Sequence, residues 1–418
     1  MKRLWLYVFC VAVLLSGCAV SNNEIPMRVD LAALGPMDGS AYAGGAVCDA
    51  LPERASEDEI SIDAIRVSAV TGERQMRIPE NLSSAFQLQL QQTTVCIPER
   101  PTVEAEIDSV LTARMADTEA EVQNVLEIVE EELNAGGQLI GSSNVYSYYA
   151  TDTITRLDDI AFSLITYHSS FTGGAHPNNR QTAINFSLKN GEALCLSDVL
   201  LPHGETVLEG MILDWLQEKA SDFGLFEGYS SVVTDKFGKA GLAQQDDAWY
   251  FSQSGLVVFF NPYDITPHAA GVVKLEFTYD TLDGILQPDY FPSVTPNQGS
   301  GSVAAGMVDE LSEELYGSFS TVEYVEAVPG EKTYVLFGAQ DAPLFDVALN
   351  VVSWIGDQAV TQRTIYAANY LSAENLVCIT VSAPEDVQNL MLQYDPGNGK
   401  QKTIYFSANE EIIYYQSD

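Results

Sequence analysis

Two of the chain's four histidines flank a glycine-rich stretch that could present a side chain for chemistry. Residues 171–179 read FTGGAHPNN, which places His176 after Gly173 and Gly174, and His168 lies in the alternating segment just before them. Glycine adopts backbone angles that other residues resist, so it can bring a side chain close to a ligand. A zinc site needs three or four ligands, and this stretch offers two. We therefore predict no metal site.

The same stretch allows two interpretations. In the first, Gly173, Gly174 and Pro177 form a rigid structural turn between two paired strands, and His176 makes a local hydrogen bond. In the second, His176 binds a ligand together with a later segment, where Tyr263, Asp264 and His268 follow one another closely. Tyr and His combine an apolar body with a polar tip, which suits recognition. Both interpretations remain open at this point.

Motifs of common enzymes are absent from the sequence. It contains no GxSxG elbow, HExxH helix, SxxK, Walker loop or GxGxxG followed by a helix. The acidic runs Glu57-Asp58-Glu59 and Asp246-Asp247 lack the frame of a calcium loop. We predict no catalytic residues and no cofactor, and we expect a non-enzymatic protein. A wall-modifying hydrolase stays an open alternative, because no pair among 58 acidic residues stands out.

The N-terminus indicates a lipid anchor. Lys2 and Arg3 precede an apolar run of signal-peptide length, which ends in Leu15-Ser16-Gly17-Cys18. This pattern resembles the lipobox of bacterial lipoproteins. We expect residues 1–17 to be a cleaved signal peptide, Cys18 to carry the lipid, and residues 18–55 to be a tether. The protein would then be extracytoplasmic and lie at the bacterial cell membrane through its lipid.

The charge and the cysteines restrict the partners and the covalent links. The formal net charge is −38, from 20 Lys and Arg against 58 Asp and Glu, which excludes a nucleic-acid partner and favours encounters with basic proteins. Besides Cys10 and Cys18, the chain has four cysteines, and none lies in a CxxC pair. Disulfides are permitted outside the membrane, but the spacing does not say how Cys48, Cys96, Cys195 and Cys378 would pair.

Residues 56–286 alternate between strand and helix patterns, with a first half at about 56–196 and a second at about 197–286. SIDAIRVSAV, SAFQLQLQQTTVCIP and LDDIAFSLITYHSSF have the period of strands, and Asn190-Gly191 indicates a hairpin. A helix is predicted to begin at the capping pair Thr118 and Glu121 and to end at Gly136-Gly137.

In the second half, a stripe from Val207 to Leu216 predicts a helix that ends before Gly224. Residues 227–247 read as a long loop. WYFSQSGLVVFFNPYDI predicts two strands around Ser254-Gly255, and GVVKLEFTYDTL a third. Helices between antiparallel strands favour an α+β fold over a doubly wound one.

The remainder of the chain has a different pattern. Residues 287–306 are rich in Pro, Gly and Ser, and we interpret them as a linker. Short alternating segments follow, among them LFDVALNVVSWIG, RTIYAANY, LVCITVSA and QKTIYFSA. This spacing predicts a small all-β sandwich over residues 307–418.

Two ordered stretches carry a resemblance to a known family. The first contains Thr172, Gly173, Gly174, Ala175 and His176; the second contains Phe260, Pro262, Tyr263, Ile265, Pro267, Ala269 and Gly271. They resemble the T-G-G-A-H and F-x-P-Y-x-I-x-P-Y-A-x-G motifs of the extracytoplasmic region shared by the anti-sigma factor RsiV and the N-terminal part of the peptidoglycan deacetylase PdaC. Ser187 and His268 depart from this pattern, where Asp and Tyr are usual.

The resemblance spans roughly residues 60–286 and implies an antiparallel sheet with helices. RsiV-like ectodomains bind lysozyme, so the resemblance implies a binding module for lysozyme or another cationic wall hydrolase. The deacetylase domain of PdaC and the sigma-binding segment and membrane span of RsiV have no counterpart in this sequence. The alternative is a module that binds peptidoglycan or another carbohydrate, or an accessory protein of a cell-wall hydrolase.

Overall fold

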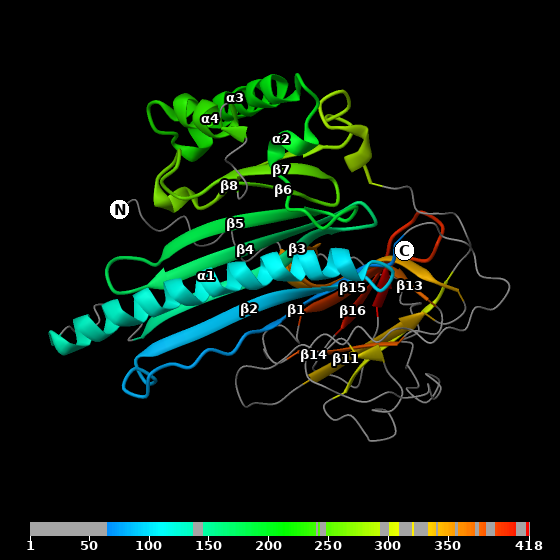
Figure 1. Ribbon diagram of the computed structural model, residues 1–418, viewed down its shortest axis with the longest axis horizontal. Coiled ribbons are helices and arrows are strands. Elements are labelled where there is room, and N and C mark those ends of the chain that lie inside the picture. Colours follow the sequence, from blue (N-terminus) through cyan, green and yellow to red (C-terminus); the bar gives the residue numbers. More distant parts are fainter. Residues whose placement is uncertain are drawn as a thin grey trace, which may run out of the picture.

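The computed structural model has a mixed α+β architecture, as the sequence predicts (Figure 1). It describes residues 65–136, 145–239, 241–242, 248–292, 301–308, 320–321, 333–339, 342–355, 358–372, 376–381, 389–406 and 415–417. The expected signal peptide (residues 1–17), the expected lipid attachment at Cys18 and the expected tether (residues 18–55) lie outside these residues. Within them, no helix is both long enough and apolar enough to cross a membrane.

A ten-stranded sheet forms the frame of the molecule. Its order is β17-β16-β15-β12-β13-β1-β2-β3-β4-β5. The strands from the first half of the chain are β1 (Ser68–Glu73), β2 (Phe86–Cys96), β3 (Tyr146–Leu157), β4 (Ala161–Phe171) and β5 (Asn178–Ser187). Only β2 and β3 among these pair in parallel, because a long helix connects them. Strands β3, β4 and β5 follow one another as antiparallel neighbours.

Helix α1 (Pro101–Asn134) lies along one face of this sheet (Figure 1). A proline at the first helical position suits its start, since the missing N–H would have no helical partner there. One buried stripe runs the whole length, at spacings of three and four: Val103, Ile107, Leu111, Met115, Thr118, Val122, Leu126 and Val129. The predicted start at Thr118 is therefore wrong. Its hydroxyl donates to the Arg114 carbonyl oxygen inside the helix.

The second half of the module forms its own small layer above β5 (Figure 1). It contains α2 (Leu196–Val199), α3 (Gly204–Phe223), α4 (Tyr229–Phe237), β6 (Trp249–Phe251), β7 (Gly255–Phe260) and β8 (Val273–Thr278), with short 3-10 turns at His268–Ala270 and Pro288–Tyr290. The apolar sides of α3 and α4 pack on β6, β7 and β8 in one core. Gly224 ends α3 in the left-handed conformation, at φ 64°.

Two expectations need correction, one in each half of the module. Residues 227–247 are not one loop, because α4 begins after Gly228 and buries Val233 and Phe237. Its apolar positions are few and Gly and polar residues surround them, so the periodic signal is weak. The predicted hairpin at Asn190-Gly191 is a turn with a single bridge between Phe186 and Ala193. The chain then enters α2 instead of a second strand.

The C-terminal strands form two sheets that share a core, as expected for a sandwich. They are β9 (Val303–Val308), β10 (Ser320–Thr321), β11 (Thr333–Ala339), β12 (Leu344–Ile355), β13 (Gln358–Leu371), β14 (Leu376–Val381), β15 (Leu390–Asp395), β16 (Lys402–Phe406) and β17 (Tyr415–Ser417). Sheet β10-β14-β11-β9 packs against the ten-stranded sheet.

The sandwich is continuous with the first region. Strand β13 pairs with β1 from Ser68 to Val70, and the Asn369 side-chain oxygen accepts a hydrogen bond from the Val67 backbone N–H at 2.9 Å. Val70 belongs to the sandwich core, whereas its neighbour Ala69 packs under α1. One sheet therefore contains strands from both regions. The linker expected at residues 287–306 separates the two regions in the sequence, but the sheet joins them in space.

The cysteines are only partly within the described residues. Cys96 is disulfide-bonded, and its partner lies outside them, as does Cys48. Cys195 is a half-buried thiol and Cys378 a buried one. Of the disulfide pairings that the sequence leaves open, those that involve Cys96 therefore remain.

Candidate functional site

The turn between β4 and β5 presents His176 to solvent. Gly173 and Gly174 have φ values of 102° and 104°, which L side chains rarely adopt. A Cβ at Gly174 would meet nothing within 4 Å, so the backbone angle and not space requires glycine there. His176 Nδ1 lies 2.9 Å from the Pro177 carbonyl oxygen, to which it donates. The local hydrogen bond orients the ring and leaves Nε2 outward.

A second turn, after β7, presents Tyr263. This residue has φ 74° although it is not glycine, and its side chain is 57% exposed. Its N–H donates to the Thr266 carbonyl oxygen at 3.0 Å. The Asp264 carboxylate closes the turn, because Oδ2 accepts from the Asn261 N–H at 2.9 Å and from Lys236 Nζ at 2.6 Å. The Asp264 side chain thus fixes the turn, and the turn exposes the ring of Tyr263.

The two turns meet on the surface. The Tyr263 hydroxyl lies 3.3 Å from His176 Nε2. The rings of His176 and His268 stack with centroids 3.7 Å apart and 20° between their planes, and the Tyr263 ring is 5.7 Å from that of His268. We call these three residues the Tyr–His patch. Three of the four residues that the sequence singled out for ligand binding are therefore in mutual contact, and the fourth, Asp264, holds the turn that carries Tyr263.

An amide side chain docks the second turn on the edge of the large sheet. Strand β5 is the edge strand, so its outer backbone groups need partners. Asn261 Oδ1 accepts from the Gln181 N–H at 2.7 Å, and Asn261 Nδ2 donates to the Gln181 carbonyl oxygen at 2.9 Å. Asn261 therefore pairs with β5 as a strand residue would, and it fixes Tyr263 relative to His176.

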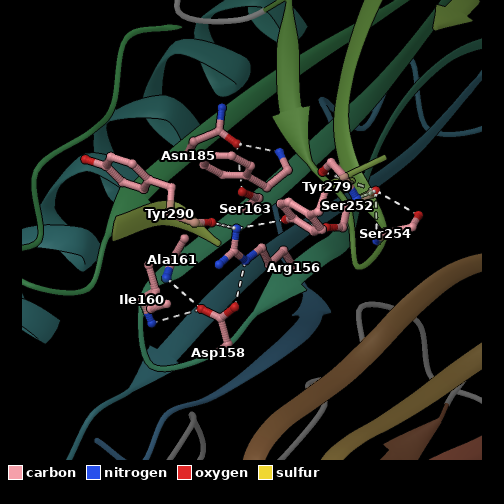
Figure 2. A network of polar contacts seen from close by, with 12 residues as sticks. Arg156, Asp158, Ile160, Ala161, Ser163, Asn185, Ser252, Ser254, Tyr279 and Tyr290 are labelled. Atoms are coloured by element: carbon pink, nitrogen blue, oxygen red, sulfur yellow. Dashed lines mark hydrogen bonds and ion pairs between the residues drawn. The ribbon is translucent and has the colours of Figure 1, made fainter. Parts of the chain in front are cut away.

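A second buried amide links β5 to β6 (Figure 2). Asn185 Oδ1 accepts from the Ser163 hydroxyl at 2.7 Å and from the Phe251 N–H at 3.2 Å. Asn185 Nδ2 donates to the Trp249 carbonyl oxygen at 3.0 Å. A fully buried amide is stable only when its donors and acceptors are paired, and these bonds connect the two layers.

Arg156 forms a third anchor between the layers (Figure 2). Its side chain is 1% exposed and its Nε is 2.7 Å from Asp158 Oδ2. Nη1 donates to the Tyr279 hydroxyl at 2.8 Å and to the Tyr290 carbonyl oxygen at 2.7 Å, and the guanidinium lies over the rings of Phe251 and Tyr279. Breaking a buried ion pair by removing one partner is strongly destabilising. Nη2 of Arg156 is buried without a hydrogen-bond partner among the described residues, so the ion pair, the two Nη1 bonds and the aromatic rings stabilise the charge. These contacts join the second half of the module to β3.

The other two histidines lie elsewhere. His203 is exposed beside the first turn of α3, and His168 is buried in β4 beneath α1. Among the described residues, no group of three or more His, Cys, Asp or Glu could hold a metal ion. The patch offers one phenol and two imidazoles, which can donate, accept and stack.

A partly buried polar network between α1 and the sheet was not predicted from the sequence. Arg114 donates to the Thr182 hydroxyl, which lies 3.3 Å from His168 Nε2. Tyr148 donates to Glu121, so its hydroxyl oxygen accepts from His168 Nδ1. Arg180 also donates to both oxygens of Glu121, at 2.6 Å each. With Nδ1 protonated, a neutral His168 accepts from the Thr182 hydroxyl through Nε2.

The electrostatics of the network favour a neutral His168. Burial, together with the positive charges of Arg180 and Arg114, lowers the pKa of His168 to about 4. For Glu121, burial acts to raise the pKa, but the bonds from Tyr148 and the charge of Arg180 outweigh it and lower the pKa. The network therefore carries a neutral imidazole and a carboxylate in the neutral pH range.

Asp152 lies in the same layer and lines a small cavity. Its carboxylate accepts from the N–H and hydroxyl of Thr93 and from the Thr166 hydroxyl. Burial raises its pKa, against the effect of these bonds and of Arg114. The cavity beside it measures about 30 Å³. That is the size of a water molecule, an order of magnitude below a typical small-molecule pocket.

One segment of this module matches the model of a described family. Residues 216–280 match the model of a family described as "Protein of unknown function (DUF3298)". The matched region begins in α3 and ends after β8, so it includes Tyr263, Asp264 and His268. No curated protein matches the chain.

Two solved structures are similar to part of the chain. One is a DUF3298 family member from Bacteroides fragilis NCTC 9343, at 17% identity and a TM-score of 0.37, over 54% of this chain and 95% of that one. The other is a DUF3298 family protein from Pseudomonas aeruginosa PAO1, at 17% identity and a TM-score of 0.30, over 54% of this chain and 94% of that one.

Proposed function

We propose that the protein is a lipid-anchored, non-enzymatic binding protein of the bacterial cell surface. In this proposal the α+β module corresponds to the extracytoplasmic region of RsiV and PdaC, and its ligand is lysozyme or another cationic wall hydrolase. The support is geometric. The two sequence stretches that carry the resemblance, one with His176 and one with Tyr263, lie in direct contact although 87 residues separate these two.

The exposed ring of Tyr263 is the observation that carries the proposal. An L residue at φ 74° costs on the order of 1–3 kcal/mol, and such strain is found mainly where function requires it. A core role does not explain the strain, because the side chain is more than half exposed. Exposed tyrosines held on a rigid support are typical anchors of protein interfaces.

The Asn261 and Asp264 contacts provide that rigid support. The Asn261 side chain bonds to the backbone of Gln181 and the Asp264 side chain bonds to Lys236 and to the Asn261 N–H, so the ring is already in place before a ligand arrives. A preorganised surface loses little conformational entropy on binding.

The charge of the chain favours a basic ligand. A net charge of −38 creates a negative field that attracts a cationic protein and raises its association rate. Electrostatic attraction of this kind is screened over about 8 Å at physiological ionic strength. We therefore expect binding to weaken steeply as salt is added.

Titration of the full mature chain with lysozyme by calorimetry, at low and at moderate salt, tests this function. We expect saturable binding at low salt and an affinity that falls about tenfold or more at moderate salt. A neutral or acidic protein of similar size serves as the control ligand and should not bind. The absence of a complex at low salt would remove lysozyme as the ligand.

A further inference from the structure

The last residue of β2, Cys96, is disulfide-bonded to a cysteine outside the described residues. Only three cysteines of the sequence lie outside them, namely Cys10, Cys18 and Cys48. All three precede Ile65, where the described part of the chain begins. The bond therefore joins the end of β2 to the segment that precedes β1.

The position of Cys96 favours a partner in that segment. Strands β1 and β2 are neighbours in the large sheet, and Cys96 pairs with Ser68, the first residue of β1 (Figure 1). The chain reaches Ser68 through Ile65 and Val67, which the Asn369 side chain holds. It donates to the Ile65 carbonyl oxygen at 2.6 Å and accepts from the Val67 N–H at 2.9 Å. The described chain thus begins beside Cys96.

We infer that Cys96 is bonded to Cys48. Cys10 lies in the apolar run of the expected signal peptide, and Cys18 is the residue whose thiol the lipid would occupy. A thiol that carries a lipid cannot form a disulfide, so Cys48 is the partner that remains. This choice rests on the lipid anchor of the proposed function. Residues 49–64 can span about 55 Å when extended, so they can connect Cys48 to Ile65 without strain.

Formation of this bond requires an oxidant. The two thiols of Cys48 and Cys96 each lose one hydrogen when their sulfur atoms join, so two electrons and two protons leave. A disulfide of another molecule accepts them and becomes two thiols. Oxidants of this kind operate outside the cytoplasmic membrane, where the proposed lipid anchor places the protein.

The fold provides a fixed point for the bond at Cys96. The next residue, Ile97, is fully buried, and its N–H donates to Glu104 Oε2 on α1 at 2.6 Å. The Ile97 carbonyl oxygen accepts from the Arg100 N–H at 2.9 Å, directly before α1 begins. Cys96 therefore lies between a paired strand and the start of a long helix.

The bond changes how a lipid anchor acts on the fold. Strand β1 lies between β13 and β2, so it joins the two regions of the sheet. Without the bond, tension from a lipid on Cys18 reaches Ile65 and pulls on β1. With the bond, tension reaches Cys96 first, and β1 carries none of it. The segment between lipid and sheet is then residues 19–47 instead of 19–64, so its greatest extended length falls from about 160 Å to about 100 Å.

Peptide mapping of the mature chain without reduction tests the pairing. Iodoacetamide first blocks all thiols of the unfolded protein, and trypsin then releases residues 29–54, with Cys48, and residues 78–114, with Cys96. We expect mass spectrometry to find these two peptides joined, and to find them separate after reduction. Alkylated Cys96, or Cys96 joined to any other peptide, would overturn the inference. The mass of residues 18–28 reports the lipid separately, so a joined pair beside an unlipidated Cys18 would contradict only the anchor.

Thermal unfolding with and without dithiothreitol tests the effect of the bond on the fold. Closure of the long loop 48–96 stabilises the protein, so we expect the reductant to lower the unfolding temperature of the unmodified chain by about 5–10 °C. Cys48→Ser should unfold at the lower temperature under both conditions. Cys195→Ser, at a half-buried thiol, is the control and should respond to the reductant as the unmodified chain does. An unmodified chain that the reductant leaves unchanged, or an equal response in Cys48→Ser, would contradict the inference.

Discussion

The hydroxyl of Tyr263 lies 3.3 Å from Nε2 of His176, across 87 residues of sequence. This contact joins two turns from different layers of the molecule. Each turn holds an unusual backbone angle, at Gly173 and Gly174 in one and at Tyr263 in the other. The Tyr–His patch is therefore a product of the tertiary fold, and changes in the layer interface should change it.

The strain at Tyr263 can be separated from its binding role. Substitution of Tyr263 by alanine or by glycine removes the ring in both cases. In the left-handed region, alanine costs about 1 kcal/mol or more, and glycine does not. We expect Tyr263→Gly to be more stable than Tyr263→Ala by about this amount in urea unfolding. Both variants should lose ligand affinity. Equal stability of the two would mean that the turn relaxes and stores no strain.

Asn261 should be needed for the docking of the second turn. In Asn261→Asp the donor that faces the Gln181 carbonyl oxygen becomes an acceptor, although the shape is unchanged. We expect a loss of about 1–3 kcal/mol in the free energy of unfolding and weaker ligand binding. The same change at exposed Asn124 on α1 is the matched control and should be nearly neutral. A neutral Asn261→Asp would show that the turn docks by other contacts.

Arg156 should be a main determinant of stability. Arg156→Ala leaves Asp158 without its cation and removes the bonds to Tyr279 and Tyr290, so we expect a loss of about 3–5 kcal/mol. Arg66→Ala breaks an exposed ion pair with Glu99 and should cost no more than about 1 kcal/mol. Thermal unfolding of both variants measures the difference. Similar losses for the two would contradict the role of Arg156 as an anchor between layers.

Because His168 is buried and its pKa is lowered, we expect the stability of the protein to depend on pH. The pKa of His168 is about 4 in the folded protein and 6.5 in the unfolded chain, so the unfolded chain binds more protons between these values. Stability is therefore fully present above pH 6.5 and falls as the pH drops toward 4, by about 3 kcal/mol in total. The pKa of Asp152 is raised by burial, which contributes with the opposite sign.

Unfolding curves of variants, measured at several pH values, isolate the contribution of His168 to the pH dependence of stability. We expect His168→Gln to lose stability at neutral pH because the network is disturbed, but to show a flatter dependence between pH 6.5 and 4. His203→Gln, at an exposed position, should retain the slope of the unmodified protein. The same slope in His168→Gln and the unmodified protein would show that His168 is not the responsible group.

Local patterns predicted most strands, because alternation depends only on neighbouring residues. Strand β12 and the pair around Ser254-Gly255 are examples, and the end of α3 at Gly224 follows from one residue. The sequence pattern places the start of α1 too late, since Thr118 and Glu121 have the spacing of a capping pair although Thr118 lies within the buried stripe. Helix α4 has no clear sequence signal, because its two buried residues, Val233 and Phe237, are too few to show a period.

The candidate site was predictable in its residues but not in its assembly. Motif residues singled out His176, Tyr263 and His268, yet their contact depends on how Asn261 meets the backbone of Gln181, which no spacing encodes. The network from Arg114 to Glu121 was not predicted for the same reason. Its members come from α1, β3, β4 and β5, and only the register of these strands aligns them. The continuity of β1 with β13 likewise requires the tertiary structure.

A calorimetric titration of lysozyme at low salt into the unmodified protein and into Tyr263→Ala tests the proposed ligand most directly. The control variant is Trp354→Ala, at an exposed position of β12 outside the Tyr–His patch. We expect lysozyme to bind the unmodified protein and Trp354→Ala, and its affinity for Tyr263→Ala to be lower by about tenfold or more. Equal affinity for all three proteins would contradict the proposal that Tyr263 anchors lysozyme.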